Sequence, residues 1–85
     1  MYYVYFLQNE QKETYIGCTN DLRRRIQRHN HGKTHATRGS SWRLIYYEAY
    51  LSKSDAFRRE QRLKDYGQAL RQLRDRLRDS LSDKS

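Results

Sequence analysis

The chain has 85 residues and carries 18 Lys and Arg against 10 Asp and Glu, which gives a net charge of +8. So short a chain accommodates one domain with a small core, which excludes a multidomain enzyme and places any functional site near the surface. The charge favours a polyanionic partner. Nucleic acid ranks ahead of an acidic membrane, because no basic amphipathic segment or lipidation motif stands out.

The composition also bears on folding and on compartment. Eight Tyr, two Phe and one Trp supply large apolar areas that disordered chains lack. No apolar run is long enough to cross a membrane, and residues 1–7 are too short and lack a basic leader for a secretory signal. The single cysteine, Cys18, cannot form an internal disulfide. We therefore expect a folded cytoplasmic protein, a monomer rather than an oligomer, with no membrane association.

Two short strands are predicted at the start of the chain. Residues 2–8, with the sequence YYVYFLQ, are aromatic and β-branched and too few for a core helix, which indicates a strand covered on both faces. The polar residues 9–13 predict a loop. Residues 14–17 then predict a second strand that pairs back on the first as a hairpin.

The middle of the chain predicts a helix, a loop and a third strand. Asn20 or Asp21 can cap a helix whose apolar face carries Leu22 and Ile26 and which extends to about residue 29 or 30. Residues 31–41 are basic and rich in Gly, Thr and Ser, which predicts a loop. The aromatic and aliphatic run at residues 42–50 predicts the third strand.

Two further helices complete the prediction. Ser52 or Ser54 can cap a helix in which Ala56, Phe57, Leu63 and Tyr66 recur at helical spacing, and Gly67 interrupts it. Leucines at 70, 73, 77 and 81 then predict a helix that packs against the rest of the domain through one narrow apolar stripe. The expected fold is α/β, a small three-stranded antiparallel sheet flanked by about three helices in the order β-β-α-β-α-α. We expect one domain over residues 1–78 and a polar tail over residues 79–85.

Arg25 lies at the edge of the apolar face of the first helix, and His29 follows one turn later on the same side. A guanidinium held at such an edge can grip a phosphate through two hydrogen bonds. The alternative is an ordinary solvated basic helix face. Further attraction to phosphates is expected from basic residues on this helix and in the loop after it: Arg23, Arg24, Arg28, Lys33 and Arg38.

Glu60 falls within the inward stripe of the second helix, where a carboxylate needs an explanation. A partly buried ion pair with Arg59 or Arg62 is one explanation. The other is a metal ligand, because Mg²⁺ commonly takes one or two carboxylates and completes its shell with water and substrate phosphate. A zinc site is disfavoured, because no Cys-x-x-Cys or His-Glu-x-x-His spacing occurs.

Tyr5 and Tyr15 are predicted to project from one face of the sheet, each with its hydroxyl on a rigid support. With an ordinary pKa near 10, tyrosine is a poor base at neutral pH unless a cation or a metal-bound water assists it. In a chain with eight tyrosines, plain packing is the competing interpretation for each of them.

Four spaced features together resemble one known family. They are Tyr3-Val4-Tyr5, Tyr15-Ile16-Gly17, Leu22-x-x-Arg25 followed by His29-Asn30, and a later Glu60. In this order the chain resembles the GIY-YIG nuclease superfamily, closest to its small stand-alone members, over roughly residues 1–75. In the first motif, Tyr3 replaces the glycine and Val4 the isoleucine.

The resemblance implies a role for each matching residue. Tyr5 and Tyr15 would be the motif tyrosines, one of them serving as or assisting the general base. Arg25 would steady the scissile phosphate with His29 assisting nearby, and Glu60 would hold Mg²⁺ or Mn²⁺. We further expect Gly17 to allow backbone or substrate to pass close, since it has no Cβ.

The function expected from this resemblance is metal-dependent hydrolysis of phosphodiester bonds in DNA. Weak sequence specificity and a preference for nicked, flapped or branched DNA are expected, with RNA left open as a substrate. One alternative is a non-catalytic basic module that binds nucleic acid through phosphates and exposed aromatic rings. Another is a protein-interaction domain that presents the leucine stripe to a partner.

Overall fold

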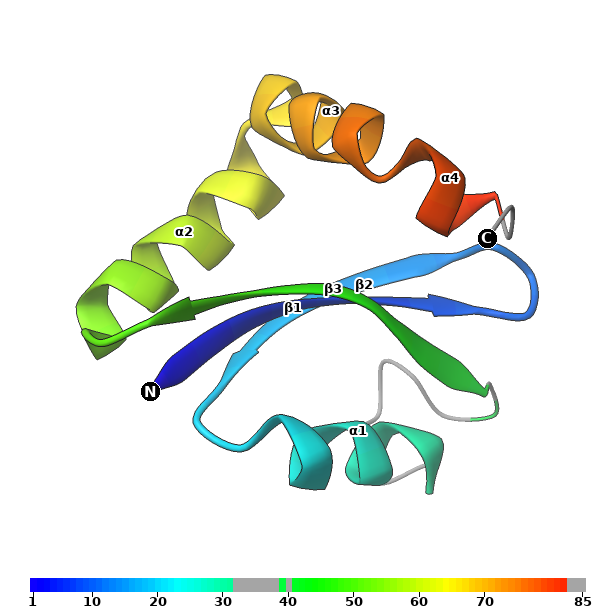
Figure 1. The fold of residues 1–85 in the computed structure, drawn as a ribbon, viewed down its shortest axis with the longest axis horizontal. Helices are drawn as coiled ribbons and strands as arrows, with labels where there is room; N and C mark the ends of the chain where they lie inside the picture. Colours follow the sequence, from blue (N-terminus) through cyan, green and yellow to red (C-terminus); the bar gives the residue numbers. More distant parts are fainter. Residues whose placement is uncertain (32–38, 40, 83–85) are drawn as a thin grey trace.

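The computed structural model describes residues 1–31, 39 and 41–82 (Figure 1). The predicted antiparallel sheet and its flanking helices are confirmed. The sheet has the strand order β2-β1-β3. In chain order the elements are β1 (Tyr2–Asn9), β2 (Thr14–Thr19), α1 (Leu22–Asn30), β3 (Trp42–Tyr50), α2 (Lys53–Asp65), α3 (Gly67–Arg76) and α4 (Arg78–Leu81).

Strand β1 lies at the centre of the sheet, and all of its residues from Val4 onward are buried. This agrees with its continuous apolar sequence, which is typical of a strand covered on both faces. A β-bulge interrupts its pairing with β3, because Phe6 pairs with Tyr46 while Leu7 pairs with Leu44. Ile45, which the bulge leaves without a partner on β1, packs on the same side of the sheet as Tyr46.

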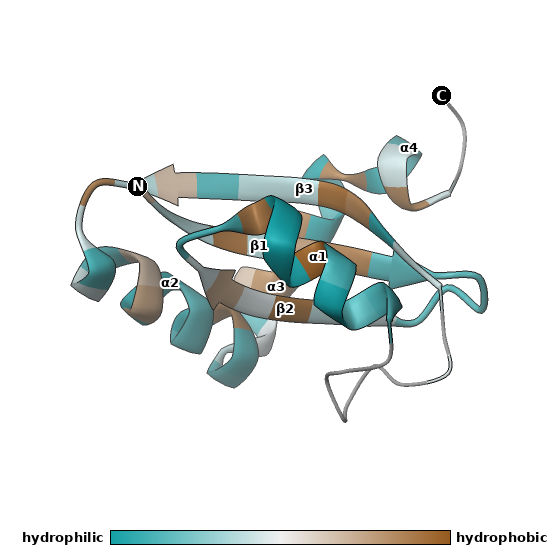
Figure 2. Cartoon of the chain, turned by 90° about the horizontal axis from the view of Figure 1, so that it is seen from below, coloured by the Kyte–Doolittle hydropathy of each residue, from teal (hydrophilic) through white to brown (hydrophobic). Residues whose placement is uncertain are grey.

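The side chains of the sheet alternate between two apolar layers. Val4 and Phe6 pack against α2 and α3, whereas Tyr5 and Leu7 pack on the other face with Trp42. Figure 1 shows this division, with α1 on one face of the sheet and α2, α3 and α4 on the other. In Figure 2, α1 crosses the sheet and is made mostly of hydrophilic residues, and hydrophobic stretches lie on the strands behind it. Each face therefore supports a helix that carries candidate site residues.

The leucine stripe packs inside the domain. Leu73 and Leu77 are buried in the layer beneath α3, and Leu70 and Leu81 pack partly buried against it. The stripe therefore contributes to the core, as ordinary packing would require. The structure adds a fourth helix, because α3 ends at Arg76 and the short α4 begins at Arg78. The stripe is therefore divided between the two helices and Leu77, the residue that joins them.

Two aromatic residues predicted to recur on the apolar face of α2 are exposed. Phe57 is 57% and Tyr66 59% exposed, while the buried residues of α2 are Ala56, Glu60 and Leu63. At about 100° per residue, Phe57 lies well round the helix from this buried stripe. Tyr66 follows the last residue of the helix. Among the described helices, none combines the length and the apolar character needed to cross a membrane.

Candidate active site

Arg25 and Glu60 line the same pocket although their helices lie on opposite faces of the sheet. The pocket lies at the end of the edge strand β2 and has a volume of about 440 Å³. Two helices and the ends of two strands contribute its lining: Tyr2, Cys18, Thr19, Asn20, Arg25, Lys53, Phe57 and Glu60. A cation and an anion thus face one surface cavity, which is the arrangement that a bound phosphate and a metal ion would need.

Local capping fixes the position of Arg25. The Thr19 hydroxyl accepts a hydrogen bond from the Asp21 backbone N–H at 3.1 Å, and the Asp21 carboxylate accepts one from the Arg24 backbone N–H at 3.1 Å. The helix therefore begins immediately after β2. Ile26 packs into the layer beneath α1, so the neighbouring Arg25 is held at the rim, half-buried.

Glu60 is only 9% exposed, on the inward side of α2. Lys64 Nζ donates to its Oε2 at 3.0 Å, and among the described residues its Oε1 has no hydrogen-bond partner. The predicted ion pair is therefore made with Lys64, not with Arg59 or Arg62. No group of three or more His, Cys, Asp or Glu gathers within the described part of the chain. A hard cation here would take one carboxylate, with water and substrate as its other ligands, which suits Mg²⁺ or Mn²⁺.

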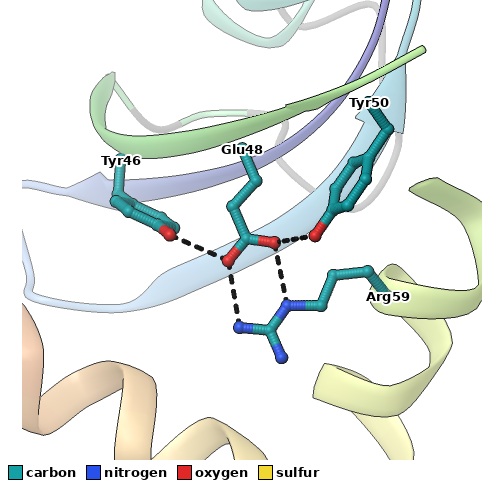
Figure 3. Close-up of polar contacts among 4 residues, drawn as sticks. All are labelled: Tyr46, Glu48, Tyr50 and Arg59. Carbon is teal, nitrogen blue, oxygen red and sulfur yellow. Dashed lines mark hydrogen bonds and ion pairs between the residues drawn. The ribbon is translucent and has the colours of Figure 1, made fainter. Parts of the chain in front are cut away.

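Glu48 on β3 anchors the helix that carries Glu60 (Figure 3). Arg59 donates to both Glu48 oxygens, from Nε at 2.8 Å and from a terminal nitrogen at 2.9 Å. The hydroxyls of Tyr46 and Tyr50 also donate to this carboxylate, at 2.8 and 2.5 Å. Sequence reasoning missed this network. The signal was Tyr-x-Glu-x-Tyr in a strand, whose alternation places all three side chains on the face toward α2.

The network has electrostatic consequences for each member. Burial acts to raise the pKa of Glu48, but the hydrogen bonds from Arg59, Tyr50 and Tyr46 outweigh it and hold that pKa below its ordinary value. Burial and the bond to Glu48 raise the pKa of Tyr50 to about 12. Since Arg59 directly precedes Glu60, this charged network fixes the rotation of α2 that directs Glu60 inward.

Tyr5 and His29 form a buried pair beneath α1. Both are fully buried, and the Tyr5 hydroxyl lies 3.0 Å from His29 Nε2. Burial raises the pKa of Tyr5 to about 12, although the nearby Arg25 guanidinium acts in the opposite direction. Burial, and then Arg25 and Arg28, lower the pKa of His29. At neutral pH the phenol is therefore protonated and the imidazole neutral.

Tyr15 completes an aromatic cluster with this pair. Its ring centroid lies 4.8 Å from that of His29 and 6.3 Å from that of Tyr5. Tyr5 and Tyr15 thus lie on one sheet face, since their partners in the hairpin register are Gly17 and Leu7. None of the three cluster residues lines the pocket of Arg25 and Glu60. Arg25 lines the pocket, and its charge acts on the pKa of both Tyr5 and His29, so it links the cluster to the pocket.

Gly17 makes room for the Tyr5 ring. The two residues are directly paired across the hairpin, and a Cβ at position 17 would overlap the Tyr5 hydroxyl and ring. We expected backbone or substrate to approach this glycine. The group that approaches is the motif tyrosine of the neighbouring strand, so the glycine and the tyrosine form one packing unit.

Comparison with known proteins assigns the family. The family model for the GIY-YIG catalytic domain matches residues 1–79. The chain belongs to this family. Curated relatives include UPF0213 proteins of Oceanobacillus iheyensis, at 37% identity over 74% of this chain and 76% of the relative, and of Halobacterium salinarum, at 38% over 81% and 92%. No solved structure matches the chain significantly. The GIY-YIG family is a nuclease superfamily, which makes nucleic acid the substrate class.

The altered first GIY-YIG motif is accommodated without blocking the pocket. Tyr3 packs edge-on against Tyr47, with ring centroids 5.9 Å apart. It is not among the residues that line the pocket of Arg25 and Glu60.

Basic residues of α1 line a second pocket beside that of Arg25 and Glu60. This α1 pocket has a volume of about 440 Å³ and shares Thr19, Asn20 and Arg25 with the first. Arg24 and Arg28 contribute its further positive charge, and Arg23 is exposed on the same helix. The predicted contacts Lys33 and Arg38 lie outside the described residues.

Proposed function

We propose that the chain is a metal-dependent endonuclease that hydrolyses phosphodiester bonds in DNA. The observation that carries the proposal is the shared pocket of Arg25 and Glu60. The carboxylate of Glu60 can bind a metal ion at this cavity. A phosphate can then lie between that metal ion and the fixed guanidinium of Arg25. The same chemistry would serve a phosphodiester of RNA.

Arg25 would bind the non-bridging oxygens of the scissile phosphate. Its helix is capped and the adjacent Leu22 and Ile26 pack partly buried against the sheet, so the guanidinium is positioned before substrate arrives. Such a fixed charge acts most strongly on the charge that develops in the transition state. Glu60 would hold Mg²⁺ or Mn²⁺, which when bound supplies Lewis-acid stabilisation of the phosphate and the leaving oxygen.

Tyr5 and His29 would handle the proton of an attacking water placed beside Arg25, the pocket residue whose charge acts on both of them, since neither lines the pocket itself. The phenol retains its own proton at neutral pH because its pKa is about 12. It would assist by accepting the proton of water while passing its own to the neutral Nε2 of His29, 3.0 Å away. Tyr15 would keep the imidazole oriented through their ring contact at 4.8 Å.

The substrate is expected to be nicked, flapped or branched DNA cut with weak sequence specificity. The α1 pocket is lined by charged and small polar side chains, and the adjoining pocket of Arg25 and Glu60 adds Lys53, so cations that suit phosphates line both. A single small domain also offers little surface for reading base edges in a groove.

The test is cleavage of labelled nicked, flapped and duplex DNA with Mg²⁺ or Mn²⁺. Glu60→Gln and Arg25→Lys should each abolish most activity while the protein still binds DNA. Asp75→Asn and Arg71→Lys are matched controls, because both residues are exposed on α3 away from the pocket. Wild-type cleavage by either site variant refutes the proposed site. Salt-sensitive binding without cleavage by any metal would favour the non-catalytic module instead.

A further inference from the structure

Phe57 occupies the junction between two pockets. With Lys53 it lines the pocket of Arg25 and Glu60, and the same two residues line an adjoining pocket of about 440 Å³. This adjoining pocket, distinct from the α1 pocket, is lined by Lys53, Ser54, Phe57, Arg58 and Gln61. The ring is 57% exposed, so one of the largest apolar side chains of α2 faces solvent directly beside the proposed catalytic carboxylate.

Cations flank this ring, one of which, Arg58, also pairs with the exposed Asp55 carboxylate at 3.3 Å. Lys53 lies one turn before Phe57 on α2, Arg58 follows it, and both are exposed. Glu60 lies three residues after Phe57, a spacing at which helical side chains are neighbours, with Cβ atoms about 5–6 Å apart. An aromatic face flanked by cations is the surface on which single-stranded nucleic acids bind, with bases stacked on rings and phosphates on Lys and Arg.

We propose that Phe57 is a stacking platform for an unpaired base next to the scissile phosphate, with Lys53 and Arg58 binding the flanking backbone. Within a continuous duplex both faces of a base are covered by its neighbours, so only a base in a flap, branch or single strand, or one that frays at a nick, can stack here. The inference rests on the proposed function and deepens it. The substrate class becomes nucleic acid with an unpaired base beside the cleaved bond.

Binding in the absence of cleavage tests the platform. In a Glu60→Gln background, affinity is measured by fluorescence anisotropy for a labelled oligothymidylate and for a blunt duplex of equal length. Phe57→Ala should weaken single-strand binding roughly 5- to 150-fold, the usual contribution of one stacked base. Duplex binding should change less than about twofold, because phosphate contacts carry it. Phe57→Trp should retain single-strand affinity, while Phe57→Leu should lose it.

Tyr66→Ala is the matched control, since Tyr66 is an equally exposed aromatic at the other end of α2 and lines neither pocket. It should leave both affinities unchanged. Thermal melting of each variant confirms folding, which an exposed residue should not disturb. The platform is refuted by equal losses for single strand and duplex, or by full affinity in Phe57→Ala or Phe57→Leu. Dissociation of an oligomer by Phe57→Ala would also refute it, because the ring would then serve a second copy of the chain.

The two proposals fail separately. If the wild-type chain cuts DNA and Phe57→Ala cuts single-stranded and flapped substrates equally well, the platform fails and the nuclease stands. If no metal supports cleavage while Phe57→Ala still selectively loses single-strand affinity, the nuclease fails and the platform stands as a binding site.

Discussion

The ring of Tyr5 lies over Gly17, in the space that a side chain at position 17 would occupy. Tyr5 Cε1 would lie 2.9 Å from a Cβ built there, and the hydroxyl would overlap it. The hydroxyl that meets His29 therefore depends on a residue without a side chain on the neighbouring strand. The first and second motifs of the family are thus coupled by packing.

Gly17→Ala should destabilise the domain by about 1–3 kcal/mol, the usual cost of overpacking a close-packed site. The measurement is chemical denaturation. Gly67→Ala is the control, because nothing lies within 4 Å of a Cβ at that position in the first turn of α3. It should be neutral or slightly stabilising, since alanine favours helix more than glycine does. Equal effects of the two substitutions would refute the proposed contact.

Glu48→Gln should lower the free energy of unfolding by about 2–4 kcal/mol, because it removes a half-buried charge that accepts four hydrogen bonds. Arg58→Gln should change stability by less than about 0.5 kcal/mol, because its ion pair with Asp55 is exposed. If Glu48 anchors α2, its variant should also raise the metal concentration needed for half-maximal activity. An unchanged metal requirement in a folded Glu48→Gln protein would show that the network does not position Glu60.

Stability should decline at alkaline pH from about 10 to 12. The pKa of Tyr5 and of Tyr50 is raised from 10 to about 12 in the folded protein, so the folded state holds these protons more tightly. Their contribution is fully present below pH 10 and is lost as pH rises through the folded pKa. Tyr50→Phe should make the decline shallower, as seen by denaturation across this range. A curve parallel to that of the wild type would contradict the assigned shift of Tyr50.

Tyr5→Phe should reduce kcat by about 10²-fold, because it retains the ring and removes the hydroxyl that assists proton transfer. DNA affinity should stay near the wild-type value, since the hydroxyl does not line the pocket. Tyr66→Phe is the control, because that hydroxyl belongs to an exposed side chain. Full activity in Tyr5→Phe would place the general base elsewhere, with Tyr15 as the next candidate.

Much of the fold followed from local signals. The apolar run of β1 and the aromatic alternation of β3 predicted their strands, and Asp21 and Ser52 were among the predicted caps that the structure uses. Phe57 was predicted on the buried face of α2 but is exposed. A period of 3.6 residues locates a helix face only to within one residue, and tertiary packing selected the stripe of Ala56, Glu60 and Leu63.

The site was less accessible to sequence reasoning. The resemblance to the family implied that Arg25 and Glu60 belong to one site. It did not show how helices on opposite faces of the sheet reach one pocket. The Glu48 network was missed because its partner, Arg59, lies 11 residues away on another element, and strand alternation alone does not name a partner. Long-range pairing of charges depends on how the elements dock.

The most direct test of the account is a double-mutant cycle on metal-dependent DNA cleavage with Glu60→Gln, Arg25→Lys and the combined variant. We predict that each single substitution lowers kcat by about 10²- to 10³-fold and that the double variant is scarcely slower than either, because both residues act on one phosphate. Losses that multiply fully in the double variant, or cleavage at the wild-type rate in either single variant, would contradict a shared site.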